Sequence, residues 1–251
     1  MQRVKKIAPW ITLLISVLVL IYAVYSFATI MLALQQSQST FTTLAQEVAA
    51  LQTEQEEATT QSEEEIIAVP VYPEIENLIG WVSIADTVVD YPIMYTPQSP
   101  EYYLHRDLEG DYSFVGVPFL EEACDMDASS YLIVYAHNMN NGTMFGSLEK
   151  YRDETYYQEH SLVICDSLTE YRTYEIAAVL YLELSQEVMD TFYAVPETED
   201  AFANLVAQIE ANALYDTGVS IEAGDQILAL STCSSRKDDE RFVVIAVKIE
   251  E

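Results

Sequence analysis

Residues 10–34 form an unbroken run of uncharged, mostly apolar side chains, WITLLISVLVLIYAVYSFATIMLAL. A helix of this run would be about 37 Å long at roughly 1.5 Å per residue, enough to cross about 30 Å of hydrocarbon with some tilt. Arg3, Lys5 and Lys6 precede it, and such a basic flank stays in the cytoplasm. We therefore expect a cytoplasmic tail over residues 1–9, a single-pass membrane anchor over residues 10–34 and an extracellular remainder.

A cleaved signal peptide is the competing interpretation of this run. Its apolar region would usually be shorter, about 7–15 residues, and would end at a clear small-x-small cleavage site. The sequence offers only weak candidates for such a site near Ala28. We favour the uncleaved anchor.

The charge of the chain argues against nucleic acid as a partner. The sequence holds 11 Lys and Arg against 41 Asp and Glu, and no acidic residue precedes Glu47. Beyond the first 35 residues the balance is therefore 8 − 41 = −33. Such a surface repels phosphate backbones, and it keeps a domain soluble.

Residues 35–71 are expected to be an extracytoplasmic stalk or linker. The first part is rich in Gln, Thr, Ser and Glu. Within it, Phe41, Leu44, Val48 and Leu51 recur at helical spacing, which predicts a short amphipathic helix. This helix could be a plain spacer or a weak self-association stripe, and we favour the spacer. The acidic run over residues 53–65 is expected to be mobile.

From residue 72 to 251 the pattern changes to short β-type runs bounded by turn residues. Two helical patterns interrupt them, at residues 143–151 and 197–215. This spacing predicts a mainly β domain with helical insertions, a closed eight-stranded β-barrel. The expected strands cover residues 80–84, 88–95, 115–120, 130–137, 162–167, 171–184, 226–232 and 241–249.

The three cysteines do not suggest a disulfide scaffold, because their number is odd. Cys165 follows apolar residues and is expected in a buried strand, whereas Cys124 lies in an acidic, loop-like stretch. A bridge between these two is possible, and two inert thiols are the favoured interpretation. Cys233 is then a free thiol.

Three chemically active side chains stand at or just beyond the ends of expected strands: Cys233, His137 and Arg241. A thiolate attacks carbonyl carbons, an imidazole moves protons, and a guanidinium stays charged and can hold an oxyanion. Each residue alone has an ordinary structural explanation as a packed thiol, a hydrogen-bonded ring or a strand-end charge. The histidines lack the close spacing of metal ligands, and no Cys-x-x-Cys pair occurs, so no metal is expected.

The local sequences around these residues resemble the sortase family, class B in particular. Sortases show a strand ending in Leu-x-Thr-Cys or Thr-x-Thr-Cys and an arginine opening the next strand, here Leu230 to Cys233 and then Arg241. Ala136-His137-Asn138-Met139 followed by Gly-Thr-Met-Phe resembles a class B hallmark. The resemblance extends over residues 72–249.

The resemblance implies a cysteine transpeptidase of secreted proteins. Cys233 would attack the carbonyl of a Thr in a C-terminal sorting signal and form a thioester, Arg241 would stabilise the oxyanion, and His137 would protonate the leaving amine. An amine of a peptidoglycan precursor would then attack the thioester and join the protein to the cell wall of a Gram-positive cell. No cofactor is implied. The residues expected to line the peptide site are Ser231, Thr232, Asn138 and Met139.

Two departures from the family pattern are visible. Ala136 stands where the family more often has glycine, and the connection from Cys233 to Arg241 is short for class B. Asp238 and Asp239 in that connection therefore cannot be matched to a particular family residue. A cysteine hydrolase, a pilin-type polymerase that uses a lysine amine, and a membrane-tethered binding module without activity remain open as alternatives.

Overall fold

The computed structural model describes residues 2–60 and 69–249. Residues 61–68 of the expected linker lie outside the described part. The chain divides into two compact units, Met1–Thr40 and Phe41–Glu251. Helix α1 (Gln2–Thr60) supplies the first unit and continues into the second. It contains a stretch long and apolar enough to cross a membrane, none of which is buried, and this stretch overlaps the expected anchor.

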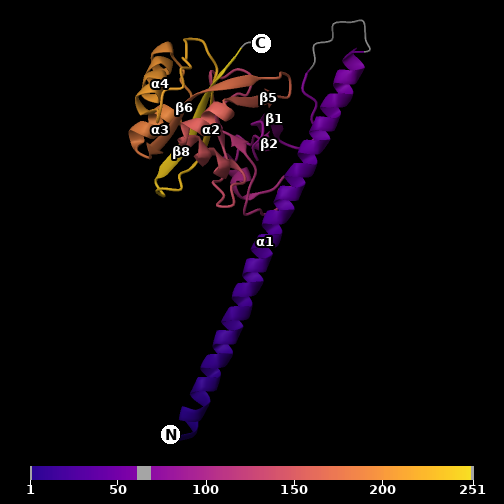
Figure 1. Cartoon of the computed structure of the whole chain (residues 1–251), viewed down its shortest axis with the longest axis vertical. Coiled ribbons are helices and arrows are strands. Elements are labelled where there is room, and N and C mark those ends of the chain that lie inside the picture. The colour runs from indigo at the N-terminus through magenta and orange to yellow at the C-terminus, as the bar shows by residue number, and fades with distance from the viewer. Residues whose placement is uncertain (1, 61–68, 250–251) are drawn as a thin grey trace. The chain divides into compact units, whose positions relative to one another are not determined.

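The second unit is built on a closed barrel of eight strands in the order β1-β2-β3-β4-β7-β8-β6-β5. This confirms the expected fold class. The helical insertions between its strands lie outside the barrel wall (Figure 1). The strands are β1 Leu78–Ser83, β2 Asp90–Met94, β3 Phe119–Leu120, β4 Tyr131–Tyr135, β5 Leu162–Ser167, β6 Thr173–Glu183, β7 Ile227–Cys233 and β8 Glu240–Lys248.

Strands β7 and β8 are buried along nearly their whole length. Every residue of β7 before Cys233 is buried, and so are most residues of β8. Burial on both faces explains why these segments read as continuous apolar runs and not as alternating patterns. One face belongs to the barrel interior, and the 3-10 helix η2 (Phe145–Arg152) contacts both strands.

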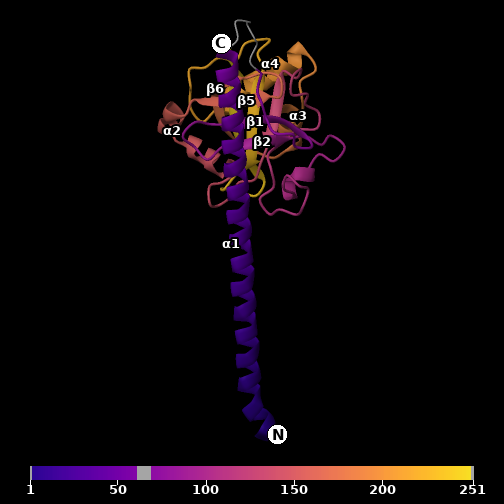
Figure 2. The ribbon, with the colours of Figure 1, turned by 90° about the vertical axis from the view of Figure 1, so that its right-hand side faces the viewer.

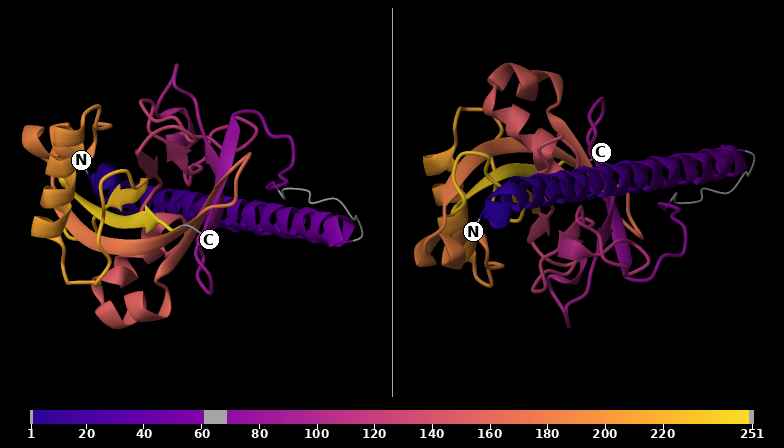
Figure 3. Two further views of the ribbon diagram at one scale, coloured as in Figure 1. Left: turned by 90° about the horizontal axis from the view of Figure 1, so that it is seen from above. Right: turned by 90° about the horizontal axis from the view of Figure 1, so that it is seen from below.

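The helical insertions begin where short polar side chains cap them. Thr198 accepts a hydrogen bond from the backbone of Ala201 and starts α4 (Glu199–Asn212), which confirms the helix expected over residues 197–215. The expected helix at 143–151 is the 3-10 helix η2. Three helices of the described residues were not expected: the 3-10 helix η1 (Tyr102–His105), α2 (Glu154–Glu159) and α3 (Gln186–Phe192). Figure 3 shows the α3–α4 pair and the η2–α2 segment on different sides of the barrel.

The amphipathic stripe of the expected stalk is helical, as predicted, and it is buried within the barrel unit. Phe41 is 6% exposed and meets the ring of Tyr91 edge-on, with 5.3 Å between the ring centroids. One turn further on, Leu44 and Val48 form a cluster with Trp81 of β1. This part of α1 therefore packs on β1 and β2 (Figure 2). The compact unit starts at Phe41, earlier than the domain start expected at residue 72.

Candidate active site

The strand order explains how His137 comes to the same edge of the barrel as Cys233 and Arg241, which follow it by 96 and 104 positions in the sequence. Strand β4 is parallel to β7, with Tyr135 opposite Ser231, so both strands end at the same edge. His137 follows the end of β4, and Cys233 is the last residue of β7. Strand β8 is antiparallel to β7 and starts at that edge, where Arg241 lies directly opposite Cys233.

Hydrogen bonds fix the two parallel strand ends to each other. The hydroxyl of Thr232 donates to the carbonyl of Ala136 at 2.7 Å, and the backbone N–H of Ala136 donates to Ser231 at 3.3 Å. The side-chain amide of Asn138 donates to the carbonyl of Cys233 at 2.7 Å. The residues that flank His137 are thus tied to the residues at and before the thiol, which favours a fixed geometry.

The environment of His137 sets its proton chemistry. Its Nε2 lies 2.8 Å from the carbonyl of Leu104, which can only accept, so Nε2 carries the hydrogen and Nδ1 is the nitrogen that exchanges a proton. Burial lowers the pKa of His137, the Leu104 carbonyl opposes this shift, and the neighbouring His105 lowers the pKa further. The neutral ring is therefore favoured in the resting site.

Exposure separates Cys233 from the other two thiols. Cys233 is exposed, whereas Cys124 and Cys165 are buried, and all three are free. Burial raises the pKa of Cys124 to about 12 and that of Cys165 further still. This agrees with the interpretation of those two as inert thiols, because only a thiolate is nucleophilic. The bridge considered between them is absent.

The guanidinium of Arg241 is oriented by its own loop. Its Nη1 donates to the carbonyls of Asp238 and Glu240, both at 3.3 Å. A guanidinium has five N–H donors, so the other nitrogens can still bind an anion. Asp238 and Asp239 help to hold this loop through their backbone carbonyls. The carbonyl of Asp238 accepts from Arg241, and that of Asp239 accepts from the backbone N–H of Leu184 at 2.7 Å.

A groove of about 500 Å³ runs along this edge and brings most of the expected site residues together. His137, Ser231, Thr232, Cys233 and Arg241 line it, whereas Asn138 and Met139 are not among its lining residues. The hydroxyls of Ser231 and Thr232 already hydrogen-bond to Tyr193 and to Ala136. The hydroxyls of these two residues therefore have only part of their hydrogen-bonding capacity left for a ligand in the groove.

Sequence reasoning missed several residues of the groove. Tyr193 follows the unexpected helix α3, and its hydroxyl pairs with Ser231 at 3.0 Å. Leu104 belongs to the 3-10 helix η1 (Tyr102–His105) and positions His137. One signal for α3 was present: Ser185 accepts from the backbone of Val188, and a serine two residues before Glu187 is typical of a helix start. Other lining residues that were missed include Met189, Leu184, Glu101 and Glu121.

Comparison with known proteins agrees with this geometry. The sortase domain family matches residues 82–249, which is more than half of the chain. The chain belongs to the sortase family. Sortase B of Listeria monocytogenes is 32% identical over 172 residues, covering 66% of this chain and 66% of that protein. Sortases are cysteine transpeptidases, so the expectation of an enzyme of this kind is confirmed by the family.

Solved sortase B structures share the fold of this sortase. Sortase B from B. anthracis in complex with AAEK1 is 28% identical, with a TM-score of 0.62 over 70% of this chain and 80% of that one. The Staphylococcus aureus sortase B–substrate complex is 18% identical and superposes with a TM-score of 0.71, over 86% of this chain and 97% of that one. These likenesses, with the curated relative, support the class B resemblance.

The loop after the thiol is short and braced in this sortase. The backbone N–H of Ser234 donates to the carbonyl of Glu240 at 2.9 Å, and that of Ser235 donates to the carboxylate of Glu149 at 2.6 Å. The same carboxylate accepts from the hydroxyl of Tyr181 at 3.0 Å. Because Glu149 belongs to η2, the turn after Cys233 is held by a helix outside the barrel wall.

Proposed function

We propose that this sortase cleaves a C-terminal sorting signal after Thr through a thioester on Cys233 and transfers the new C-terminus to an amine of the cell-wall peptidoglycan. The observation that carries the proposal is the arrangement of Cys233, His137 and Arg241 along one groove at a single barrel edge. Thiol, proton carrier and fixed cation are the three parts that acyl transfer through a cysteine requires.

The first step makes the thioester. The Cys233 thiolate attacks the carbonyl carbon of the Thr residue, and negative charge develops on its oxygen. Arg241, directly opposite Cys233 in the ladder, stabilises that oxyanion. The His137 imidazolium donates the Nδ1 proton to the leaving amine, since Nε2 is bonded to Leu104.

The second step resolves the thioester. Neutral His137, the form that burial favours, accepts a proton from the incoming amine as its nitrogen attacks the thioester carbon. The Cys233 thiolate leaves, and an amide joins the two substrates. The groove is where the sorting peptide binds, with Ser231 and Thr232 in its floor, and Asn138 and Met139 support the site from behind His137.

The apolar stretch of α1 supports a proposal for where the reaction takes place. We propose that residues 10–34 anchor the protein in the cell membrane, with the basic N-terminus in the cytoplasm and the barrel outside, where secreted proteins emerge. The partners are secreted proteins with sorting signals and a peptidoglycan amine.

Product analysis tests this function. The full-length chain in detergent micelles is incubated with a panel of sorting-signal peptides, with and without triglycine, and intact-mass spectrometry follows enzyme and peptides. We expect peptide–triglycine products that require both triglycine and Cys233, with Cys233→Ala inactive. Cleavage that ignores the amine would point to a hydrolase, and a product formed with lysine side chains alone would point to a pilin-type polymerase.

A further inference from the structure

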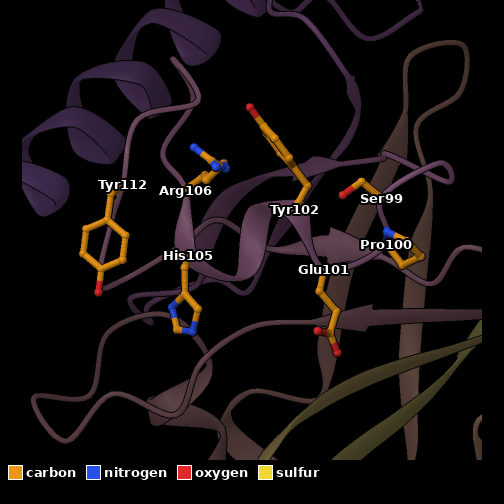
Figure 4. Close-up of a pocket in the computed structure, with 7 residues that line it drawn as sticks. All are labelled: Ser99, Pro100, Glu101, Tyr102, His105, Arg106 and Tyr112. Carbon is orange, nitrogen blue, oxygen red and sulfur yellow. The ribbon is translucent and has the colours of Figure 1, made fainter.

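A second hollow lies beside the catalytic groove. It has a volume of about 710 Å³, in the range of small-molecule sites, and it surrounds the 3-10 helix η1. Figure 4 shows the seven side chains that line it. Pro100 and Glu101 line both this hollow and the catalytic groove, so the two adjoin along these residues. The lining residues of the η1 hollow are Ser99, Pro100, Glu101, Tyr102, His105, Arg106 and Tyr112.

The η1 hollow reaches the proton carrier of the proposed reaction. Leu104 of η1 holds Nε2 of His137 through its carbonyl. The next residue, His105, lines the hollow, and its ring centroid is 5.2 Å from that of His137. A molecule bound in the η1 hollow is therefore next to the imidazole that must accept a proton from the incoming amine.

Charge and aromatic surface in the η1 hollow suit a short zwitterionic peptide. Arg106 lies 4.8 Å above the ring centroid of Tyr102 and donates to the carbonyl of Gly110 at 2.6 Å. These contacts orient its guanidinium and leave N–H donors for a carboxylate. Glu101 supplies a carboxylate for an ammonium group on the side shared with the groove. Tyr112, fixed by a β-bridge to Arg106, adds a ring stacked near His105.

We propose that the η1 hollow binds the acceptor substrate, an amine-bearing peptide that also carries a carboxylate. The inference rests on the proposed function and deepens it, because it names the entry site of the second substrate. Glu101 holds the amine at the mouth of the catalytic groove, and Arg106 binds the carboxylate farther away. Arg106 thereby determines acceptor specificity without touching the reacting atoms.

The step that follows balances as an ordinary aminolysis. The ammonium group beside Glu101 first loses one proton to solvent. The neutral amine nitrogen then forms a bond to the thioester carbon, the C–S bond breaks, and the electron pair leaves with sulfur. The proton lost by the amine passes to Nδ1 of His137 and then to the Cys233 thiolate. The products are one amide and the free thiol.

The test varies the acceptor and Arg106 together. Full-length wild type and Arg106→Gln are charged with a cleavable sorting peptide, and the amine concentration for half-maximal transfer is measured for triglycine and for triglycine amide. We expect Arg106→Gln to raise this concentration about fivefold for triglycine, because that change corresponds to the upper end of what an exposed ion pair contributes to binding. For triglycine amide, which lacks the carboxylate, the concentration should stay almost unchanged. Thioester formation without amine should not change.

Three comparisons make the result specific. Arg106→Lys keeps a positive charge and should restore much of the triglycine affinity. Lys150→Gln removes one exposed positive charge from η2, outside the hollow, and should behave as wild type. Nα-acetyl-lysine repeats the measurement with a side-chain amine, so both peptide and lysine acceptors are covered.

The inference and the proposed function fail in different ways. If every variant forms the thioester but Arg106→Gln leaves the half-maximal concentrations unchanged, or raises them equally for triglycine and its amide, the acceptor site is elsewhere. If the wild type forms no thioester with any sorting peptide, the proposed function itself is wrong, and the inference falls with it.

Discussion

Cys233 and Arg241 are directly opposite each other at the end of the β7–β8 ladder that adjoins the connecting loop. The pairing continues without a bulge to Ile227 and Val247, so the whole hairpin fixes this one contact. A slip of one residue would turn Arg241 to the other face of the sheet. The guanidinium is therefore placed beside the thiol by strand register, and a loop sequence alone would not hold it there.

Replacing Arg241 tests its role at the oxyanion. Arg241→Lys keeps the charge but loses the planar set of donors, and we expect thioester formation to slow by about a hundredfold, the loss found for one oxyanion donor. The KM for the peptide should change little, because the interaction strengthens only in the transition state. Stopped assays of peptide cleavage measure both quantities. Arg236→Gln, in the same loop but outside the groove, is the control. A loss confined to KM would assign Arg241 to peptide binding alone.

His105 should affect the pH dependence of cleavage through His137. The reacting form holds one proton between thiol and imidazole, so the acid limb follows the lower apparent pKa of the pair. The pKa of His137 is lowered, first by burial and also by His105, which places its titration on that limb. In His105→Asn the pKa of His137 rises, and the acid limb should move to higher pH. The profile of kcat/KM for peptide cleavage without amine measures this shift.

The matched control for this profile is His160→Asn. His160 packs on Tyr156 and lies 3.2 Å from the carbonyl of Ala85. It does not line the groove, so its replacement should leave the acid limb in place. If the acid limb shifts equally in both variants, or in neither, His105 does not set the pKa of His137.

Arg172 should stabilise the fold without affecting chemistry. Its buried guanidinium donates to Glu170, to the carbonyl of Met126 at 2.6 Å and to Asp127. Arg172→Met leaves that carbonyl unpaired, and we expect the free energy of unfolding to fall by about 2 kcal/mol. Denaturant unfolding of the full chain in detergent measures it, and kcat/KM should stay near wild type at low temperature.

The contribution of Arg172 to the free energy of unfolding should decrease at acid pH. The pKa of Glu170 is lowered, chiefly by its hydrogen bond from Lys248; burial opposes this shift, and Arg172 lowers the pKa further. A carboxylate with a lowered folded pKa stabilises fully above its unfolded value of about 4.3 and loses this effect as the pH falls below it. The gap between wild type and Arg172→Met should therefore narrow below that pH. A constant gap would mean that packing alone explains the loss.

The buried stripe of α1 should belong to the cooperative unit of the barrel. Phe41→Ala removes a ring that packs on Tyr91, and we expect a loss of about 3 kcal/mol in the free energy of unfolding. Fluorescence of Trp81, which clusters with Leu44 and Val48, reports the transition. Gln46→Ala on the exposed face of the same helix should cost less than about 0.5 kcal/mol. If both variants unfold like wild type, the segment acts only as a spacer.

Much of the fold could be read from the sequence where burial is on both faces. The apolar runs of β7 and β8 and the capping threonine of α4 are local signals, and each element was expected close to its observed bounds. Only part of the groove could be predicted from the sequence. Cys233 and Arg241 carry a recognisable motif, but Leu104 and Tyr193 enter through η1 and α3, which short sequences without strong periodicity encode. The stripe at Phe41 gave the right helix, but its partner on β2 depends on tertiary packing that the spacing does not reveal.

The most direct test of the central claim is to locate the acyl group on the enzyme. The full-length chain is mixed with a cleavable sorting peptide, quenched in acid and mapped by peptide mass spectrometry. The account predicts one hydroxylamine-sensitive adduct, carried by the fragment with Cys233, with Cys124 and Cys165 unmodified and Cys233→Ala unable to cleave. Cleavage by Cys233→Ala at the wild-type rate, or an adduct on either buried thiol, would contradict it.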